Sequence, residues 1–187
     1  MHAKPDLRVV LKWMIVGSGS VIAAVIMPTD GRWPILNQPT KFVAKYFRMS
    51  LLRHVIRVEL PNGSLCDISG NAFTLGGSFE LDDRKFNFNG ETLFANDTAL
   101  ADFNYSSGVM GVGESFALVE PDGEFMFALR PQGRFGSNQF SVSSPDSTKA
   151  EITRSFFGRR FTANASDEIR PEFVLLCLWV VMVKMSG

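Results

Sequence analysis

The stretch that most constrains this chain is Pro171–Met185, because the eleven residues from Phe173 to Val183 are all apolar. Pro171 and Glu172 suit the first turn of a helix, where proline is tolerated and a carboxylate meets the positive helix end. A helix that is apolar on every side has to be buried in protein or in lipid. Eleven residues span only about 17 Å, roughly half of a bilayer core. The sequence therefore predicts a helix enclosed by protein, with Leu176 and Trp179 almost fully buried.

Composition favours one folded domain without a metal or cofactor. The chain has 187 residues, 45% of them hydrophobic, including 17 phenylalanines. That length is sufficient for a substantial core. The formal net charge is zero, which argues against a polyelectrolyte binder as a whole. Cys66 and Cys177 lie far apart and form no Cys-x-x-Cys pattern, so we expect neither a disulfide framework nor a zinc site, and a reducing compartment is the simpler interpretation.

The N-terminal 40 residues differ from the rest. A basic start precedes a mostly apolar run, Val9–Met27, which is similar to a signal peptide or a short anchor. Lys12 interrupts that run and no Ala-x-Ala cleavage site follows, so a packed element or a non-native start remain alternatives. The pattern predicts an N-terminal segment and linker over residues 1–40 and a β-domain over 41–187. The location of the protein stays open between the cytoplasm and the membrane surface, with an N-terminal membrane anchor as a further alternative.

Short strands dominate the region from Phe42 to Ala163. Asn62-Gly63, Asn89-Gly90 and Asp122-Gly123 are hairpin signals between runs of alternating residues. After a first strand near Phe42, the expected strands are His54–Leu60, Ser64–Ile68, Phe73–Leu75, Ser78–Leu81, Lys85–Phe88, Glu91–Ala95, Ala99–Tyr105, Glu114–Glu120, Phe125–Arg130, Gln139–Ser143, Lys149–Arg154 and Arg160–Ala163. A closed antiparallel β-barrel of about twelve strands around the C-terminal helix would leave no free sheet edge and would cover the helix.

Three segments resemble a known group, the tubby C-terminal-like superfamily, which includes the LURP-one-related proteins and the phospholipid scramblases. Cys66–Leu81 is similar to an early hairpin of that barrel, Ala150–Ala163 to its last two strands, and Glu172–Met185 to its terminal helix. The resemblance covers about residues 42–187 and implies a barrel threaded by the helix. It also suggests binding to anionic phospholipid at a membrane surface, although barrels of this kind differ widely in role.

Two glycine-containing motifs are better explained as turns than as ligand sites. Gly108–Ser115 has the spacing of a phosphate-binding loop, but Glu114 occupies the lysine position and would repel phosphate. Asn87–Gly90 is similar to the centre of a calcium loop, but Lys85 and Asn96 stand where acidic ligands are needed. Calcium, which the scramblase resemblance would suggest, is therefore not expected here.

The sequence offers little from which to build a catalytic site. The only histidines are His2 and His54, no Gly-x-Ser-x-Gly elbow occurs, and Asp82-Asp83 is typical of a solvated turn. We therefore expect a non-enzymatic binding or scaffold protein without a catalytic residue. The alternatives are a small hydrolase-like enzyme that uses His54 and a nucleic-acid-binding module, of which the latter is disfavoured by the balanced charge.

Charge is segregated along the chain. Residues 31–58 contain six bases and no acid, whereas residues 59–124 contain twelve acids and two bases. The bases alternate with aromatic and aliphatic residues, a pattern that fits an anionic lipid surface. The candidate lipid- or anion-binding residues are Lys41, Lys45, Arg48, Arg53 and Arg57, which we expect to point outward. The competing interpretation is that these bases pair with acids on neighbouring strands.

Overall fold

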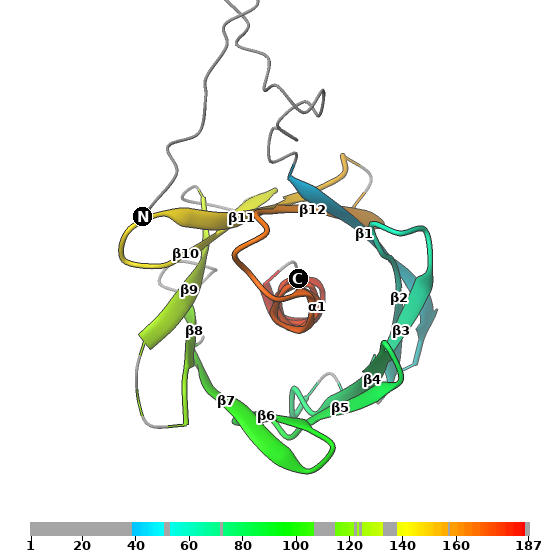
Figure 1. Ribbon diagram of the computed structural model, residues 1–187. Helices are drawn as coiled ribbons and strands as arrows, with labels where there is room; N and C mark the ends of the chain where they lie inside the picture. The colour runs from blue at the N-terminus through cyan, green and yellow to red at the C-terminus, as the bar shows by residue number, and fades with distance from the viewer. Residues whose placement is uncertain are drawn as a thin grey trace, which may run out of the picture. The chain divides into compact units, whose positions relative to one another are not determined.

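The computed structural model describes residues 39–50, 53–71, 73–106, 115–121, 123, 125–132, 138–156 and 158–185. Within these ranges twelve antiparallel strands form a closed barrel around one helix, which confirms the predicted fold (Figure 1). Each strand pairs with the next in sequence, and β1 closes the barrel by pairing with β12. The strands are β1 Thr40–Met49, β2 His54–Glu59, β3 Leu65–Gly70, β4 Gly77–Leu81, β5 Arg84–Phe88, β6 Thr92–Ala95, β7 Thr98–Ser106, β8 Ser115–Val119, β9 Phe125–Pro131, β10 Gln139–Ser143, β11 Thr148–Arg154 and β12 Arg160–Ala165.

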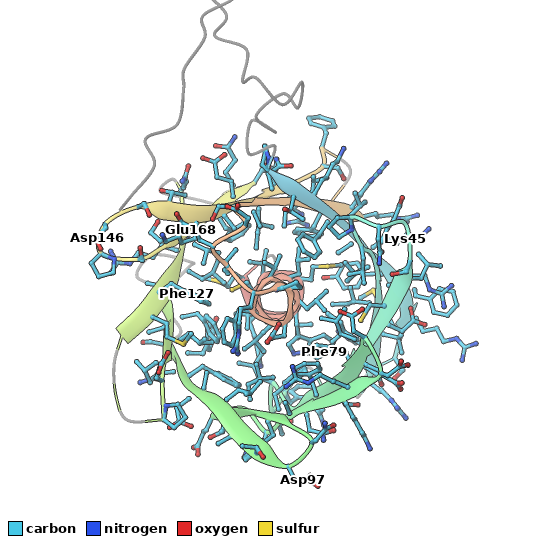
Figure 2. All side chains as sticks on the ribbon, in the orientation of Figure 1. Lys45, Phe79, Asp97, Phe127, Asp146 and Glu168 are labelled. Atoms are coloured by element: carbon cyan, nitrogen blue, oxygen red, sulfur yellow. The ribbon has the colours of Figure 1, made fainter. Side chains whose placement is uncertain are left out.

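Side chains alternate between the interior of the barrel and its outer surface, as the two-residue period of a strand requires. In β2, Ile56 and Val58 are buried while Glu59 is exposed. Figure 2 shows Phe79 and Phe127 pointing into the barrel and Lys45 pointing away from it. Stacked and edge-on phenylalanine pairs, such as Phe79 on Phe86 with ring centroids 4.9 Å apart, fill the space between sheet and helix.

One predicted strand is wrong: Phe73–Leu75 lies in the loop between β3 and β4. The side-chain oxygen of Asn71 accepts the backbone N–H of Phe73 at 2.8 Å, and Leu75 adopts a positive φ of 57°. Both features belong to turns, because an asparagine oxygen that caps a nearby N–H competes with strand pairing. As a result β3 and β4 are joined by only two residue pairs, Ser69 with Ser78 and Gly70 with Gly77.

The helix α1 (Pro171–Val180) continues as a π-helical turn, Val181–Met185. Pro171 stands at its start after an extended Arg170, as the sequence predicts. Leu176 and Trp179 are both 0% exposed, so the predicted burial is confirmed. The one charged residue buried with the helix, Glu172, has its Oε1 3.1 Å from Nε of Arg170, which compensates the carboxylate.

The helix axis defines two ends of the barrel. The helix enters from the side of β12, and its last turn is held near the β1–β2 and β3–β4 loops. There the hydroxyl of Tyr46 donates a hydrogen bond to the carbonyl of Met182, and Nζ of Lys184 donates to the carbonyl of Phe73 at 3.1 Å. We call this the exit end and the opposite one the entry end. Because neighbouring strands are antiparallel, the hairpin loops alternate between the two ends.

Residues 1–38 lie outside the described residues, so the predicted N-terminal segment and its boundary near residue 40 stay predictions. The first strand begins at Thr40. Among the residues that the structure describes, no helix is long and apolar enough to cross a membrane.

Candidate functional site

The candidate bases of β1 lie on the outer surface of the barrel. Lys41, Lys45 and Arg48 are exposed, whereas Phe42 and Ala44 between them are buried. Strict alternation would turn Arg48 inward, because it has the same parity as the buried residues. A register shift between Tyr46 and Arg48 inserts Phe47 as a bulge and pairs Arg48 with Val55. The bulge therefore returns Arg48 to the outer surface and leaves Phe47 44% exposed.

The structure adds a base that the sequence analysis missed, Arg160 at the start of β12. Lys45 pairs with Arg160 on one side and with Arg57 on the other, so three bases lie in a row across three strands. Like charges placed directly opposite each other are destabilising. Among the described residues neither Lys45 nor Arg160 has an ion pair. The local sequence does not indicate that Lys45 and Arg160 are neighbours, because they meet only through the pairing of the first strand with the last.

Arg57 is engaged with an acid of the next strand, as the competing interpretation expects. Its Nε and Nη2 each donate to a carboxylate oxygen of Asp67 at 2.7 Å. This two-point geometry is the strong form of an arginine–carboxylate pair. The guanidinium also lies 3.8 Å from the ring centroid of Phe47, within cation–π range. The positive charge of Arg57 is therefore largely compensated by Asp67.

Hydrogen bonding from Arg57 lowers the pKa of Asp67 below its ordinary value, and the charges of Arg57 and Arg48 add to the effect. A lowered folded-state pKa stabilises the fold above the unfolded pKa of about 4 and loses that contribution as the pH falls through the folded value. We expect the carboxyl carbon of Asp67, followed by NMR, to titrate below the ordinary aspartate range. In Arg57→Gln its midpoint should move back up; an unchanged midpoint would contradict the assigned cause.

Arg53 lies just before β2 at the exit end. Its Nε and Nη2 donate to Oγ of Ser69 at 3.0 and 2.8 Å, which holds the exposed guanidinium over β3. Arg53, Ser69, Gly70 and Asn71 line an open hollow of about 400 Å³. Ser69 is neutral and no described acid forms an ion pair with Arg53, so this hollow suits an anionic group.

His54, the residue of the hydrolase alternative, is the first residue of β2 and pairs with Met49 and with Gly70. Its ring meets that of Tyr46 edge-on with centroids 6.4 Å apart. The Nδ1 atom is buried without a hydrogen-bond partner. In the described part of the chain no serine and no carboxylate is hydrogen-bonded to His54, and the hydrolase alternative stays a prediction.

A second hollow, of about 390 Å³, lies at the entry end where the helix begins. Glu120, Met126, Phe127, Lys149, Glu168, Ile169, Arg170 and Phe173 line it. Its two bases are both paired, Lys149 with Glu168 and Arg170 with Glu172. Because both bases are paired with acids, this hollow is a weaker anion site than the outer surface of β12, β1 and β2.

Of the two glycine-containing motifs, the structure describes only Asn87–Gly90. Gly108–Gly113 and Glu114 lie outside the described residues. In the other motif the side-chain oxygen of Asn89 accepts the backbone N–H groups of Glu91 and Thr92 at 3.0 and 2.9 Å, as in a turn. The described residues include no group of three or more histidine, cysteine, aspartate or glutamate side chains able to hold a metal ion.

Comparison of the sequence with models of known protein families and with curated proteins finds no match. The resemblance to the tubby C-terminal-like superfamily therefore stays a prediction. The barrel and its enclosed helix are shown by the structure alone.

Proposed function

We propose that this chain is a non-enzymatic binding protein of the tubby-like kind that associates with an anionic phospholipid surface. The observation that carries the proposal is the pair of opposed bases, Lys45 and Arg160, which lack an ion pair among the described residues. Around them the outer surface of β12, β1, β2 and β3 presents five bases and two acids: Lys41, Lys45, Arg48, Arg57 and Arg160 against Glu59 and Asp67.

Concentrated positive charge that the described residues do not neutralise favours an anionic partner. Holding Lys45 opposite Arg160 costs stability in the isolated protein. An anionic surface would relieve that repulsion, so the stability lost to it in the free protein would contribute to the free energy of binding. Each base close to anionic lipid contributes about 1 kcal/mol, and salt screens the attraction.

The resemblance of Cys66–Leu81, Ala150–Ala163 and Glu172–Met185 to a superfamily that includes the phospholipid scramblases points to lipid as the partner. A nucleic acid would also meet the charge requirement, and a scaffold role would need no anion. Binding assays with lipid vesicles and with nucleic acid separate these alternatives. Binding to neither would leave the scaffold role.

Neutralising the opposed pair tests the proposal. In Lys45→Gln/Arg160→Gln, affinity for vesicles of phosphatidylserine and phosphatidylcholine should fall by roughly 30-fold at low salt, because two bases at about 1 kcal/mol each are lost. Co-sedimentation with the vesicles measures this. Raising the salt to about 0.5 M should weaken binding of the unaltered protein strongly.

The matched control is Arg84→Gln/Lys85→Gln, which removes two exposed bases on β5. These bases lie near the entry end, and Lys85 is opposite an acid, Glu80. The control should leave vesicle binding unchanged. Equal binding to vesicles of phosphatidylcholine alone, or equal losses in the two double variants, would reject the proposal.

A further inference from the structure

Large hydrophobic side chains that remain exposed gather at one end of the barrel. Among the described residues five are exposed: Phe47 at 44%, Met49 at 63%, Leu65 at 62%, Phe73 at 65% and Phe156 at 93%. Four of these lie at or beside the exit end, and only Leu65 lies at the entry end. Isolated exposed hydrophobic residues are ordinary, but several gathered on one surface indicate an interaction site.

The strand pairing places three of them, Met49, Phe73 and Phe156, around the same rim. Met49 is the last residue of β1, which runs toward the exit end. Because Arg160 pairs with Lys45, the β11–β12 hairpin that carries Phe156 lies beside that end of β1. The carbonyl of Phe73 accepts a hydrogen bond from Lys184 in the last turn of the helix, which places the β3–β4 loop at this end too.

Charge differs between the two ends. The described loops of the exit end carry the bases Arg53 and Arg159 and one acid, Glu91, and Arg48 and Arg160 lie on the adjoining strand ends. The described loops of the entry end carry one base, Arg170, and seven acids: Asp82, Asp83, Asp97, Glu120, Asp146, Asp167 and Glu168. Two of these acids, Asp97 and Asp146, are visible on hairpins at the periphery of Figure 2. An anionic surface would attract the exit end and repel the entry end.

We propose that the barrel docks end-on, with Met49, Phe73 and Phe156 entering the interfacial layer of an anionic lipid bilayer. The inference rests on the proposed function and adds an orientation and an inserted element to it. Arg48, Arg53 and Arg159 then lie at the level of the headgroups, where long basic side chains are favoured. The hollow lined by Arg53, Ser69, Gly70 and Asn71 opens at the same end and accommodates an anionic headgroup.

Lipid fits this surface better than nucleic acid does. Phe73 and Phe156 lie on separate loops around the barrel rim, and Met49 adds an aliphatic chain between them. Single-stranded nucleic acid is bound by aromatic rings that follow one another along a basic groove. Aromatic residues at the interface of a bilayer need only a common depth, which hairpins at one end of a barrel provide.

A fluorophore attached at either end tests the orientation. Cys66 and Cys177 are buried, and burial raises the pKa of the Cys66 thiol to about 11 and that of the Cys177 thiol further still. Both native thiols are therefore poorly reactive, since the thiolate is the nucleophile. An environment-sensitive label placed through Phe156→Cys or Phe73→Cys is expected to brighten and shift to the blue on phosphatidylserine vesicles. Nitroxide groups on the lipid chains should quench it.

The matched control is Leu65→Cys, which carries the label at the entry end with similar exposure. Its emission is expected not to change although the protein binds. If the protein binds with salt sensitivity but the labels at residues 65, 73 and 156 respond alike, end-on docking is overturned and the proposed function stands. If neither labelled nor unlabelled protein binds the vesicles, both are overturned.

Serine substitutions supply a second measurement that needs no label. Phe73→Ser/Phe156→Ser should weaken vesicle binding about tenfold or more, because the apolar area that enters the interface is lost. Leu65→Ser should leave binding unchanged. Equal losses in the two proteins overturn the inference, as does a brightening of the residue-156 label on single-stranded nucleic acid but not on vesicles.

Discussion

Replacing Trp179 with aspartate is expected to abolish soluble folded protein. The indole is 0% exposed and meets Phe88 edge-on with ring centroids 5.8 Å apart. Losing a buried tryptophan costs about 3–5 kcal/mol, and an unpaired buried carboxylate adds several more. Together these losses approach the whole stability of a typical domain, about 5–15 kcal/mol. Soluble yield and a circular-dichroism melt measure the effect.

Leu176→Asp, and deletion of residues 171–187, should have the same outcome, because each removes or charges the centre of the core. The matched control is Phe156→Asp, which introduces the same charge at an aromatic residue that is 93% exposed. This control should fold normally. A protein without residues 171–187 that remained monomeric and unfolded cooperatively would contradict the role assigned to the helix.

Gly70→Val should destabilise the barrel by about 3 kcal/mol, the upper part of the usual range for an overpacked core. A Cβ at Gly70 would lie 2.4 Å from the carbonyl oxygen of Gly76 and 2.7 Å from Cζ2 of Trp179. Neither neighbour can move easily, since one is backbone and the other is fully buried. The clash also falls on the β3–β4 ladder, which has only two residue pairs. Urea denaturation measures the loss as a lower midpoint.

Gly76→Ala is the control for a nearby glycine with more space. A Cβ there would lie 3.2 Å from Oγ1 of Thr74 and 3.4 Å from the carbonyl oxygen of Phe88, so a small shift accommodates it. The loss should be well below that of Gly70→Val. Equal losses would show that the close approach of Trp179 to Gly70 is not what limits the site.

The helix could be predicted because its evidence is local. Eleven consecutive apolar residues after Pro171 and Glu172 are too few to span a bilayer and too apolar for a surface. Most strands were equally predictable, since Asn-Gly turns and two-residue alternation depend only on neighbouring residues. The strand predicted at Phe73–Leu75 is wrong, because the composition of this segment suits a strand, whereas the hydrogen bond from Phe73 to Asn71 and the positive φ of Leu75 make it a loop.

The candidate surface was only partly predictable. That Lys41, Lys45 and Arg48 share a strand follows from the sequence, although the bulge at Phe47 that turns Arg48 outward does not. The hydrogen bonds of Arg57 to Asp67 and of Arg53 to Ser69 depend on the register of β2 with β3. The first contact compensates the charge of Arg57, whereas the second positions Arg53 without compensating its charge.

By itself the sequence determined that this chain would enclose its C-terminal helix in an antiparallel barrel, because burial of apolar surface and strand alternation are properties of local segments. Only the tertiary structure brought Arg160 beside Lys45 and placed Met49, Phe73 and Phe156 around one rim. Closure of β1 against β12 joins residues from opposite ends of the barrel sequence. Such neighbourhoods depend on the number, direction and register of all the strands together, which no single segment encodes.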